Sequence, residues 1–544
     1  MNRQHVLNLM VGVVVFACVG IGLPVQAQVT PFDLVGHIQK FTLDTPTDPF
    51  SAAKLTVNGI QVTIPRNLVI QFPAAYFTAQ QVFENAQGIS KKNKESGLAL
   101  EDQKPPLAAF EVAIAGNIVG GEYRAGLVSI SQQSLNNSAG FIHGITPATG
   151  MMCVGASPTA TTCQTGDARI RLNDPKITDT ADVAFNDGRY GMKNPDGCRV
   201  LPLPSDLCAD DPNSRYPDPR FTVDQGNPTV HALTGYPMCV PRLNTDDKCP
   251  AGNRPKDLEG NFLRTFVMDN TVLIPPANFG ADPVKPCGPK SLNMCNPEKQ
   301  APFVVGDYVT YAGTLAEDTV GRYVSVHTMV ANVGIYTGPG GPAYVTLDES
   351  LLGTKGNIVL CGSTAECQDR IKVEGFTTDP NRTVNIYAVD VAVPGGAQTA
   401  RRLTNTPNPN GVGLVNTAKD QAVWGRFRYV TGKNAGVLFD SRGVLKGATR
   451  ELMARINDDN PFPDGSAIPE SPKVANGLTA GIYVAPIGEY IFPEPTGVQG
   501  GPLPALNFQC LAFLVNGWAL PGLSSIQTLS PWPGISPSAL SCSN

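Results

Sequence analysis

Residues 54–65 read KLTVNGIQVTIP, and this stretch decides the class of fold. Apolar and polar residues alternate on both sides of Asn58-Gly59. An alternation with a period of two is typical of strands that bury one face, and Asn-Gly suits the positive φ angles of a two-residue hairpin turn. The stretch therefore predicts a β-hairpin that ends at Pro65 and presents one apolar face to a core.

Stretches of the same character recur along the chain. Residues 110–131, 306–315 and 384–393 are rich in Val, Ile and Tyr and are interrupted by glycines or polar residues. The 544-residue chain contains 55 Gly and 48 Pro, a share that suits short strands and turns better than long helices. One short helix is expected at 74–86, within a fold that is otherwise all-β.

Four glycines along the chain lie in similar sequence surroundings, each two residues before Ile, Leu or Thr: Gly36, Gly116, Gly313 and Gly375. A glycine lets a strand bend sharply around a small closed barrel. The pattern predicts tandem small β-barrels or sandwiches, although all-β chains also repeat such patterns by chance.

The first 27 residues are typical of a secretory signal peptide. Arg3 precedes an apolar run over 6–23, and Pro24 and a small-residue ending at Ala27 follow. A retained membrane anchor and lipid attachment at Cys18 are the alternatives. No later apolar run in the sequence approaches the ~20 residues that span a bilayer. We therefore expect a mature chain that is secreted or periplasmic and has no membrane span.

Cysteine usage favours export as well. Of 13 cysteines, Cys18 lies in the signal peptide and the others fall into neighbouring pairs. An even number in an exported chain indicates disulfides, and no Cys-x-x-Cys, which zinc and redox sites commonly use, occurs in the sequence. The expected bonds are Cys153 with Cys163, Cys198 with Cys208, Cys239 with Cys249, Cys287 with Cys295, Cys361 with Cys367, and Cys510 with Cys542.

Composition divides the mature chain into blocks. The segment 173–300 is dense in Pro, Asp, Asn and Gly and predicts an ordered, disulfide-rich loop insertion. The Pro-rich end predicts an extended C-terminal tail. The expected division is a signal peptide at 1–27, β-modules at 28–106, 107–172, 301–373 and 374–450, the insertion at 173–300, and the C-terminal segment at 451–544.

Some of these stretches resemble a known kind of protein. VGHIQKF at 35–41, together with the hairpin at 54–65, resembles the OB-like small-barrel modules of uncharacterised secreted proteins. The stretches 218–242 and 489–497 resemble blocks of large secreted bacterial and fungal proteins without an assigned activity. The resemblance covers most of the mature chain through short motifs. It implies tandem OB-like barrels and an extracellular location, and it carries over no catalytic residue.

Charge and motifs exclude several functions. The chain has 41 basic and 46 acidic residues and a net charge of −5. We expect no nucleic-acid partner, because binding to phosphates requires a basic surface. The sequence contains no G-x-S-x-G, no H-E-x-x-H and no P-loop. The mature chain has four histidines, and none has a spacing that requires a metal: His37, His143, His231 and His327.

Aromatic and basic residues provide candidates for ligand binding. On a predicted strand beginning at Trp424, Arg426 and Arg428 share the face of that tryptophan, while Phe427 and Tyr429 occupy the other face. Aromatic rings can stack on sugars, but large aromatics also serve as core and loop anchors. The candidate ligand-binding residues are Trp424, Arg426, Arg428, Trp518 and Trp532.

Two acidic clusters are weak candidates for calcium. They contain Asp210 and Asp211, and Asp458 and Asp464. Ca²⁺ prefers oxygen ligands, but neither cluster has EF-hand spacing, and Asp is equally favoured in solvated turns. No cofactor is expected, with calcium as the alternative.

Two functions remain open from the sequence. The first is a non-catalytic extracellular binding, surface or structural protein whose ligand is a polysaccharide or another cell-surface component. The second is a secreted hydrolase, glycosidase-like or stabilised by calcium, whose site is assembled only in three dimensions. Glycosidases need only two carboxylates at a suitable separation, so the lack of a local motif does not exclude them.

Overall fold

The computed structural model describes the middle of the chain in separate ranges. These are residues 30–49, 51–65, 68–119, 121–132, 136–147, 149–174, 218–224, 227, 229–241, 246, 249–257, 259–268, 285–286, 295–318, 320–338, 341–353, 365–366, 371–391, 398–403, 425–430, 451–456, 466–467, 473–474, 478–491 and 494–495. The expected signal peptide and most of the C-terminal tail lie outside these residues.

The first barrel is a closed ring of five strands. Its strands are β1 (Thr30–Leu43), β2 (Ala53–Val57), β3 (Ile60–Ile64), β6 (Glu111–Val119) and β7 (Glu122–Ser131). β1 pairs antiparallel with β2 and β6, and the ring closes where β3 runs parallel to β7. This order of pairings is that of an OB-like barrel, so the expected class of fold is confirmed.

The predicted hairpin forms the β2–β3 part of this barrel. Asn58 and Gly59 have φ angles of 51° and 77°, as the two-residue turn requires. Leu55, Val57 and Val62 are buried in the barrel core. The apolar residues of the alternating pattern are therefore those that point into the barrel core.

Two short strands and two short helices join β3 to β6. They are β4 (Val69–Gln71), β5 (Tyr76–Thr78), α1 (Ala79–Glu84) and α2 (Gly88–Asn93). Thr78 and Gln81 form a capping box, which begins α1 at Ala79. The helix expected from residue 74 is therefore shorter, because the cap begins the helix only after β5.

A cluster of polar side chains stabilises the closure between β3 and β7. Glu122 Oε1 accepts from Thr63 Oγ1 at 2.5 Å, and Lys54 Nζ lies 3.4 Å from the same oxygen. Arg124 Nη2 donates to Glu122 Oε2 at 3.0 Å. The bonds from Thr63 and Arg124 lower the pKa of Glu122 from its usual 4.5 to about 2.

This cluster gives a testable pH dependence. Because the folded-state pKa is depressed, the ionised carboxylate stabilises the fold above pH 4.5, and this contribution is lost as the pH falls towards 2. Glu122 is 41% exposed, so we expect a contribution of only about 0.5–1 kcal/mol. Urea titrations of the wild type and Glu122→Gln should differ at pH 6 and converge near pH 2. A difference that stays constant across this range would contradict the assignment.

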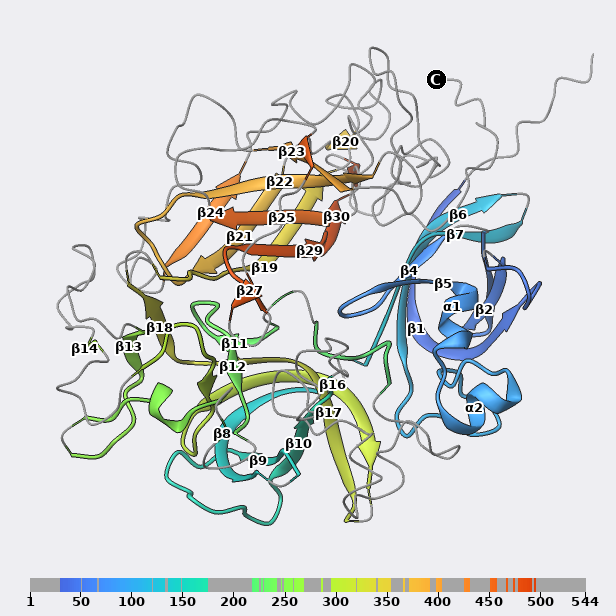
Figure 1. Ribbon diagram of the computed structural model, residues 1–544. Helices are drawn as coiled ribbons and strands as arrows, with labels where there is room; N and C mark the ends of the chain where they lie inside the picture. Colours follow the sequence, from blue (N-terminus) through green and yellow to red (C-terminus); the bar gives the residue numbers. More distant parts are fainter. Residues whose placement is uncertain are drawn as a thin grey trace, which may run out of the picture.

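The second barrel has the same order of pairings as the first. Its strands are β8 (Asn137–Thr146), β9 (Met151–Gly155), β10 (Ala168–Leu172), β16 (Tyr308–Glu317) and β17 (Arg322–Ala331). β8 pairs with β9 and β16, and β10 closes the ring by running parallel to β17. Figure 1 shows this barrel at the bottom of the view and the first barrel at the right.

The two barrels cross the divisions expected from composition. β6 and β7 follow residue 107 but belong to the first barrel, so the division expected between 106 and 107 runs through it. β8 to β10 and β16 to β17 were expected in separate modules, on either side of the insertion, but form one ring.

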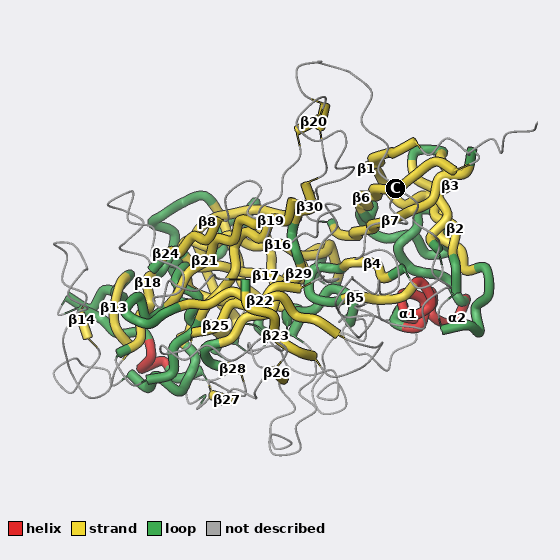
Figure 2. Tube along the Cα trace, turned by 90° about the horizontal axis from the view of Figure 1, so that it is seen from above, coloured by secondary structure: helices red, strands yellow, loops and turns green. Residues whose placement is uncertain are grey.

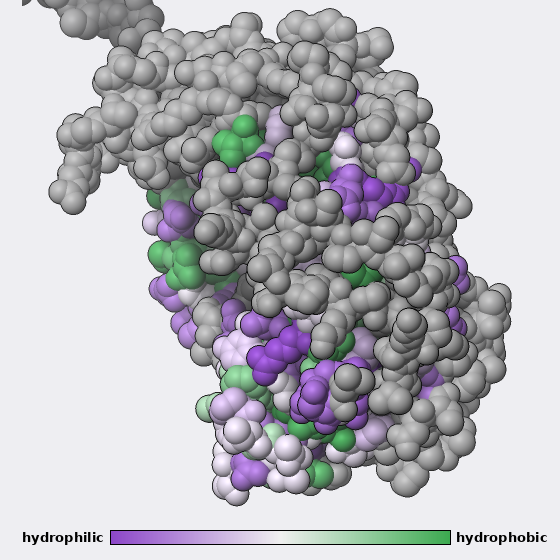
Figure 3. Space-filling view, turned by 90° about the vertical axis from the view of Figure 1, so that its left-hand side faces the viewer, coloured by the Kyte–Doolittle hydropathy of each residue, from purple (hydrophilic) through white to green (hydrophobic). Residues whose placement is uncertain are grey.

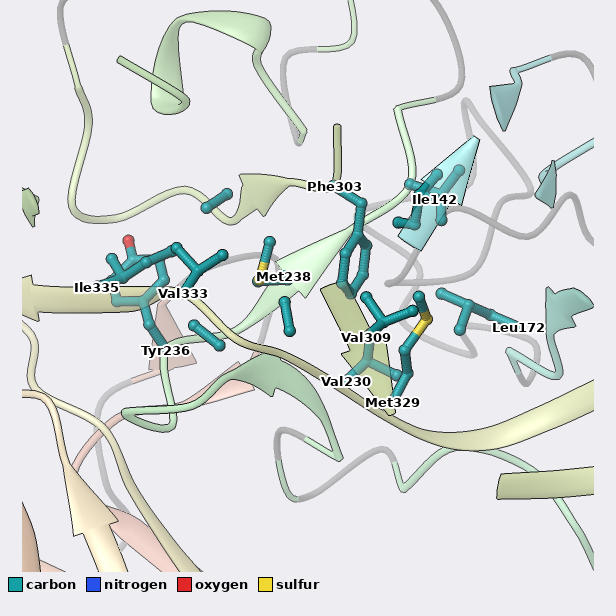
Figure 4. Packing of buried hydrophobic residues seen from close by; sticks show 14 of the residues in the cluster. Ile142, Leu172, Val230, Tyr236, Met238, Phe303, Val309, Met329, Val333 and Ile335 are labelled. Carbon is teal, nitrogen blue, oxygen red and sulfur yellow. The ribbon is translucent and has the colours of Figure 1, made fainter. Parts of the chain in front are cut away.

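The insertion between β10 and β16 contributes to the core of the second barrel. Its described elements are β11 (Val230–Ala232), β12 (Met238–Cys239), η4 (Ala251–Asn253), β13 (Thr265–Met268), β14 (Lys285–Pro286) and β15 (Ala301–Pro302). Val230, Tyr236 and Met238 are buried in one cluster with Val309 and Met329 of the barrel (Figure 4). The insertion thus completes the hydrophobic core of this barrel.

One short piece of the insertion connects the two barrels. Phe221 is buried in the core of the first barrel, where it stacks on Phe110 at 4.9 Å, and Val223 is buried in the core of the second. Arg220 pairs with Asp218 and donates through Nη1 to the carbonyl of Val82 at 3.0 Å. These contacts fix the segment 218–223 to both barrels.

The third unit is a sandwich of two sheets that share one core. One sheet contains β19 (Val345–Gly353), β21 (Ile371–Thr377), β24 (Arg426–Val430) and β30 (Glu489–Ile491). The other contains β22 (Val384–Val391), β23 (Gln398–Arg402), β25 (Glu451–Ile456), β26 (Ser466–Ala467) and β29 (Ile482–Pro486). The remaining short strands are β18 (Gly334–Thr337), β20 (Ala365–Glu366), β27 (Lys473–Val474), β28 (Leu478–Thr479) and β31 (Glu494–Pro495).

On the side seen in Figure 3, the described hydrophobic residues form small patches between hydrophilic ones.

Three of the four glycines lie beside β-bulges. The pairing of β6 with β7 shifts at Gly116, that of β16 with β17 shifts at Gly313, and that of β19 with β21 shifts beside Gly375. A Cβ atom at any of these positions would overlap a carbonyl oxygen of the neighbouring strand. A side chain is therefore excluded where the strand bends. Gly116 and Gly313 occupy the same position in the two barrels, at the bulge between the last two strands of each ring.

Candidate functional site

A cavity of about 630 Å³ lies on the first barrel, between the second half of β1, the loop to β2, and the two helices. Figure 2 shows both helices beside the barrel strands. The lining residues are Lys40, Phe41, Thr42, Leu43, Pro46, Thr47, Gln80, Phe83, Glu84, Lys91, Lys94, Glu95, Glu101 and Asp102. The volume is within the range of small-molecule sites.

The cavity has aromatic rings on one side. Phe41 is buried and packs edge-to-face against Phe83 at 5.1 Å between ring centroids. Phe83 comes from α1 and is half-buried, so part of its ring remains accessible. A ligand with an apolar face can therefore pack against this ring.

The rest of the lining carries charges of both signs. Lysines at 40, 91 and 94 are exposed, as are Glu84 and Glu101. Lys40 Nζ and Glu101 Oε2 are 3.8 Å apart at the surface, a weak pair that a ligand can displace. The rim thus offers both donors and acceptors of hydrogen bonds.

Two further carboxylates come from the loop after α2. Asp102 Oδ2 accepts from Ser96 Oγ at 3.0 Å and from the amide of Ala99 at 3.2 Å. Burial raises the pKa of Asp102, and the charge of Glu95 adds to this rise. Glu95 Oε1 accepts from the amide of Gln103 at 3.1 Å, whereas its Oε2 is buried and has no hydrogen-bond partner. Glu95 therefore brings a buried, unused acceptor to the lining of the cavity.

The ligand-binding candidates from the sequence are found elsewhere or lie outside the described residues. Phe427 is buried in the sandwich core, so the alternation predicted for this strand agrees with the structure. Arg426 and Arg428 face away from that core, and both pair with Glu374, the latter at 3.1 Å. Their guanidinium groups therefore have a structural partner. Trp424, Trp518 and Trp532 lie outside the described residues.

No calcium site is found in the part of the chain that the structure describes. The candidates Asp210, Asp211, Asp458 and Asp464 all lie outside it. Within the described ranges, no group of three or more His, Cys, Asp or Glu is placed to hold a metal ion.

The histidines have structural surroundings. His143 is buried, and its Nδ1 lies 2.8 Å from Asp167 Oδ2 while its Nε2 lies 2.8 Å from the carbonyl oxygen of Ser157. Against the effect of burial, the backbone N–H of Gln164 and the ring of His143 lower the pKa of Asp167. His327 is buried and His231 is partly buried, and this loss of solvent lowers the pKa of each to about 4. His37 is exposed on β1.

Two of the expected disulfides lie within the described residues, and both form. Cys153 is bonded to Cys163, and Cys239 to Cys249, with Cα–Cα distances of 5.5 and 6.0 Å. Cys295 is also disulfide-bonded, to a partner outside the described residues. The other expected bonds involve cysteines at positions that the structure does not describe: Cys198, Cys208, Cys287, Cys361, Cys367, Cys510 and Cys542.

The cavity on the first barrel was not predicted from the sequence. Its lining comes from a strand, a loop and two helices that share no local motif. The one available signal was the cluster of three lysines and one glutamate in KKNKE at 91–95, which is equally typical of a solvated helix end.

Among the described residues, no helix combines the length and the apolar character needed to cross a bilayer. Comparison with known proteins gives no relative: no family model, no curated protein and no solved structure matches the chain.

Proposed function

We propose that this protein is an extracellular, non-catalytic binding protein and that the cavity on the first barrel takes a carbohydrate. The observation that carries the proposal is the combination of an accessible Phe83 ring with a rim of charged donors and acceptors. Sugar rings have an apolar C–H face and a periphery of hydroxyl groups, so they match such a lining. OB-like barrels commonly use their surface and loops for ligands of this class.

Several features support the extracellular part of the proposal. The N-terminal residues are typical of a signal peptide, and disulfides form at Cys153–Cys163 and Cys239–Cys249. Disulfides persist in oxidising compartments. The resemblance of 35–41 and 54–65 to barrel modules of secreted proteins agrees with this location.

Hydrolysis is the second candidate, favoured by one observation. Asp102 has a raised pKa, and the charge of Glu95 contributes to it. In glycosidases, two carboxyl groups serve as acid and base, and the acid has a raised pKa. Both groups, however, accept hydrogen bonds within their own loop, Asp102 from Ser96 and Ala99, and Glu95 from Gln103. These bonds give both carboxyl groups a structural role in the loop. We therefore favour a binding function over hydrolysis.

The proposal is tested by a glycan array, followed by calorimetry on the best glycan with three variants. Phe83→Ala should weaken binding by about tenfold or more, because it removes the aromatic contact. Lys91→Ala should weaken it by a few-fold. Lys92→Ala is the matched control, since Lys92 is exposed on the same helix but does not line the cavity, and its affinity should equal that of the wild type.

A hydrolase panel run in parallel separates the two functions. The non-catalytic assignment fails if the wild type turns over a glycan and Glu95→Gln abolishes the turnover. The site itself fails if glycan binding is unchanged in Phe83→Ala and Lys91→Ala.

A further inference from the structure

Three arginines are almost fully buried in the described residues, and one of them lacks an acidic partner. Arg220 pairs with Asp218 through Nε and Nη2, and Arg254 pairs with Asp307 through both terminal nitrogens. Arg171 is 4% exposed and forms no ion pair with any described residue. A buried guanidinium without an anion is costly, so Arg171 requires an explanation.

The described partners of Arg171 leave part of its charge uncompensated. Its Nη2 donates to Tyr323 Oη at 3.0 Å, and its Cζ lies 4.8 Å from the centre of the Tyr323 ring. Its Nε is buried and has no hydrogen-bond partner. Tyrosine supplies a neutral oxygen and a ring face, which compensate a cation less than a carboxylate does.

Two further buried polar groups without a partner lie on neighbouring strands of the second barrel, on the same face as Arg171. Arg171 on β10 and Thr314 on β16 both lie opposite Ser325 of β17, one on each side. His327 lies two residues beyond Ser325, at the bulge of β17. Directly opposed residues share a face of the sheet, and adjacent strands are about 5 Å apart, so the backbones of Arg171 and Thr314, on either side of β17, are about 10 Å apart. Thr314 Oγ1 and His327 Nε2 are buried without a partner, like Arg171 Nε.

The protonation of His327 makes its ring a suitable donor. Burial lowers the pKa of His327 to about 4, so the ring is neutral near pH 7. Its Nδ1 lies 2.9 Å from Thr328 Oγ1, and when that hydroxyl donates to Nδ1, the proton of the ring is on Nε2. Arg171 Nε, Thr314 Oγ1 and His327 Nε2 are then three buried donors without an acceptor on the same part of the second barrel.

Asn173 adds an acceptor beside these donors. It continues β10 two residues after Arg171, and its backbone N–H donates to the carbonyl of Val326 at 2.7 Å, next to His327. Its Oδ1 is buried without a partner. A ligand that satisfies all four groups must accept several hydrogen bonds and donate one.

We propose that Arg171, Thr314, His327 and Asn173 form a buried site for a small tetrahedral oxyanion, with a protonated phosphate preferred. The anion replaces the carboxylate that the other two buried arginines have. A protonated phosphate oxygen donates to Asn173, which sulfate, fully ionised near pH 7, does not do. This site is on the second barrel and is independent of the cavity proposed to take carbohydrate.

The test begins with the full chain, purified in chloride buffer and then unfolded. Ion chromatography of the released anions should find about one phosphate per chain if the site is filled during folding. If it is empty, addition of phosphate should raise the midpoint of thermal unfolding with the logarithm of its concentration, and sulfate should raise it less. Arg171→Met should remove both signals, reducing phosphate affinity by about a hundredfold through loss of a charge-assisted donor.

Two further variants keep the test decisive. Arg169→Met is the matched control, because Arg169 lies on the same strand but pairs with Asp318 at 2.8 Å, and the phosphate response should be unchanged. Thr314→Val removes one donor with little change in volume and should weaken phosphate binding by about tenfold, even if Arg171→Met does not fold.

The proposal is overturned if the wild type releases no phosphate or sulfate and its unfolding midpoint responds to neither. It is also overturned if Arg171→Met is as stable as the wild type in phosphate buffer, because an arginine that binds an anion cannot be removed without loss.

Discussion

Arg254→Met is expected to lower the free energy of unfolding by about 3–5 kcal/mol, one of the two largest effects predicted for single substitutions in this protein. Arg254 and Asp307 are 1% and 5% exposed, and they join through two hydrogen bonds of 2.7 and 3.1 Å. Removal of the guanidinium leaves the carboxylate of Asp307 buried without its charge partner. The pair connects the insertion to the start of β16, so its loss loosens the second barrel.

Urea unfolding of the wild type and the variant measures this effect. Arg169→Ala is the control, because it breaks an ion pair that is 25% exposed at the arginine and should cost only about 1 kcal/mol. The double variant Arg254→Met, Asp307→Leu should recover part of the loss, since it leaves no buried charge. A single variant within about 1 kcal/mol of the wild type would show that the carboxylate gains another partner or water.

Gly313→Ala is expected to destabilise the protein by about 3 kcal/mol or more. The new Cβ would overlap the backbone carbonyl of Ser325 on the neighbouring strand, and backbone cannot move without loss of the β16–β17 pairing. Gly116→Ala should behave similarly in the first barrel, where the overlap is with the carbonyl of Arg124.

Gly36→Ala provides the control for this prediction. A Cβ at Gly36 would contact the side-chain amide of Asn58, which can rotate away at the loss of one exposed hydrogen bond to the carbonyl of Val35. We expect a cost of about 1 kcal/mol. Thermal unfolding followed by circular dichroism compares the variants, and equal losses at positions 36 and 313 would refute the role assigned to the bulge.

Local features of the fold were readable from the sequence. The period-two alternation around Asn58-Gly59 identified the hairpin, because alternation follows directly from strand geometry. The pairing of Cys153 with Cys163 and of Cys239 with Cys249 followed from their spacing of 10 residues. Three of the four repeated glycines, Gly116, Gly313 and Gly375, lie beside β-bulges, because steric exclusion acts at a single position.

The pairing of strands that are distant in the chain could not be predicted from the sequence. β10 ends at Leu172, and its parallel partner β17 begins at Arg322, on the far side of the insertion. Local composition changes sharply between these strands, so the halves of one barrel were assigned to separate modules. Nothing in the periodicity of a strand identifies which remote strand completes its hydrogen bonds.

The candidate cavity could not be predicted for a related reason. Phe41 and Phe83 are ordinary apolar residues of a strand and a helix in the sequence, and only the fold brings their rings to 5.1 Å. The candidates from the sequence were tryptophans and arginines instead, and both arginines, Arg426 and Arg428, are paired with Glu374.

The segment 218–223 has a consequence for the order in which the chain matures. The core of the first barrel contains Phe221, which is synthesised long after the last strand of that barrel ends at Ser131. The second barrel in turn needs β17, which ends at Ala331. A nascent chain emerging N-terminus first therefore cannot complete the core of the first barrel before Phe221 emerges, and it cannot close the second barrel before β17, when more than half of the chain has emerged.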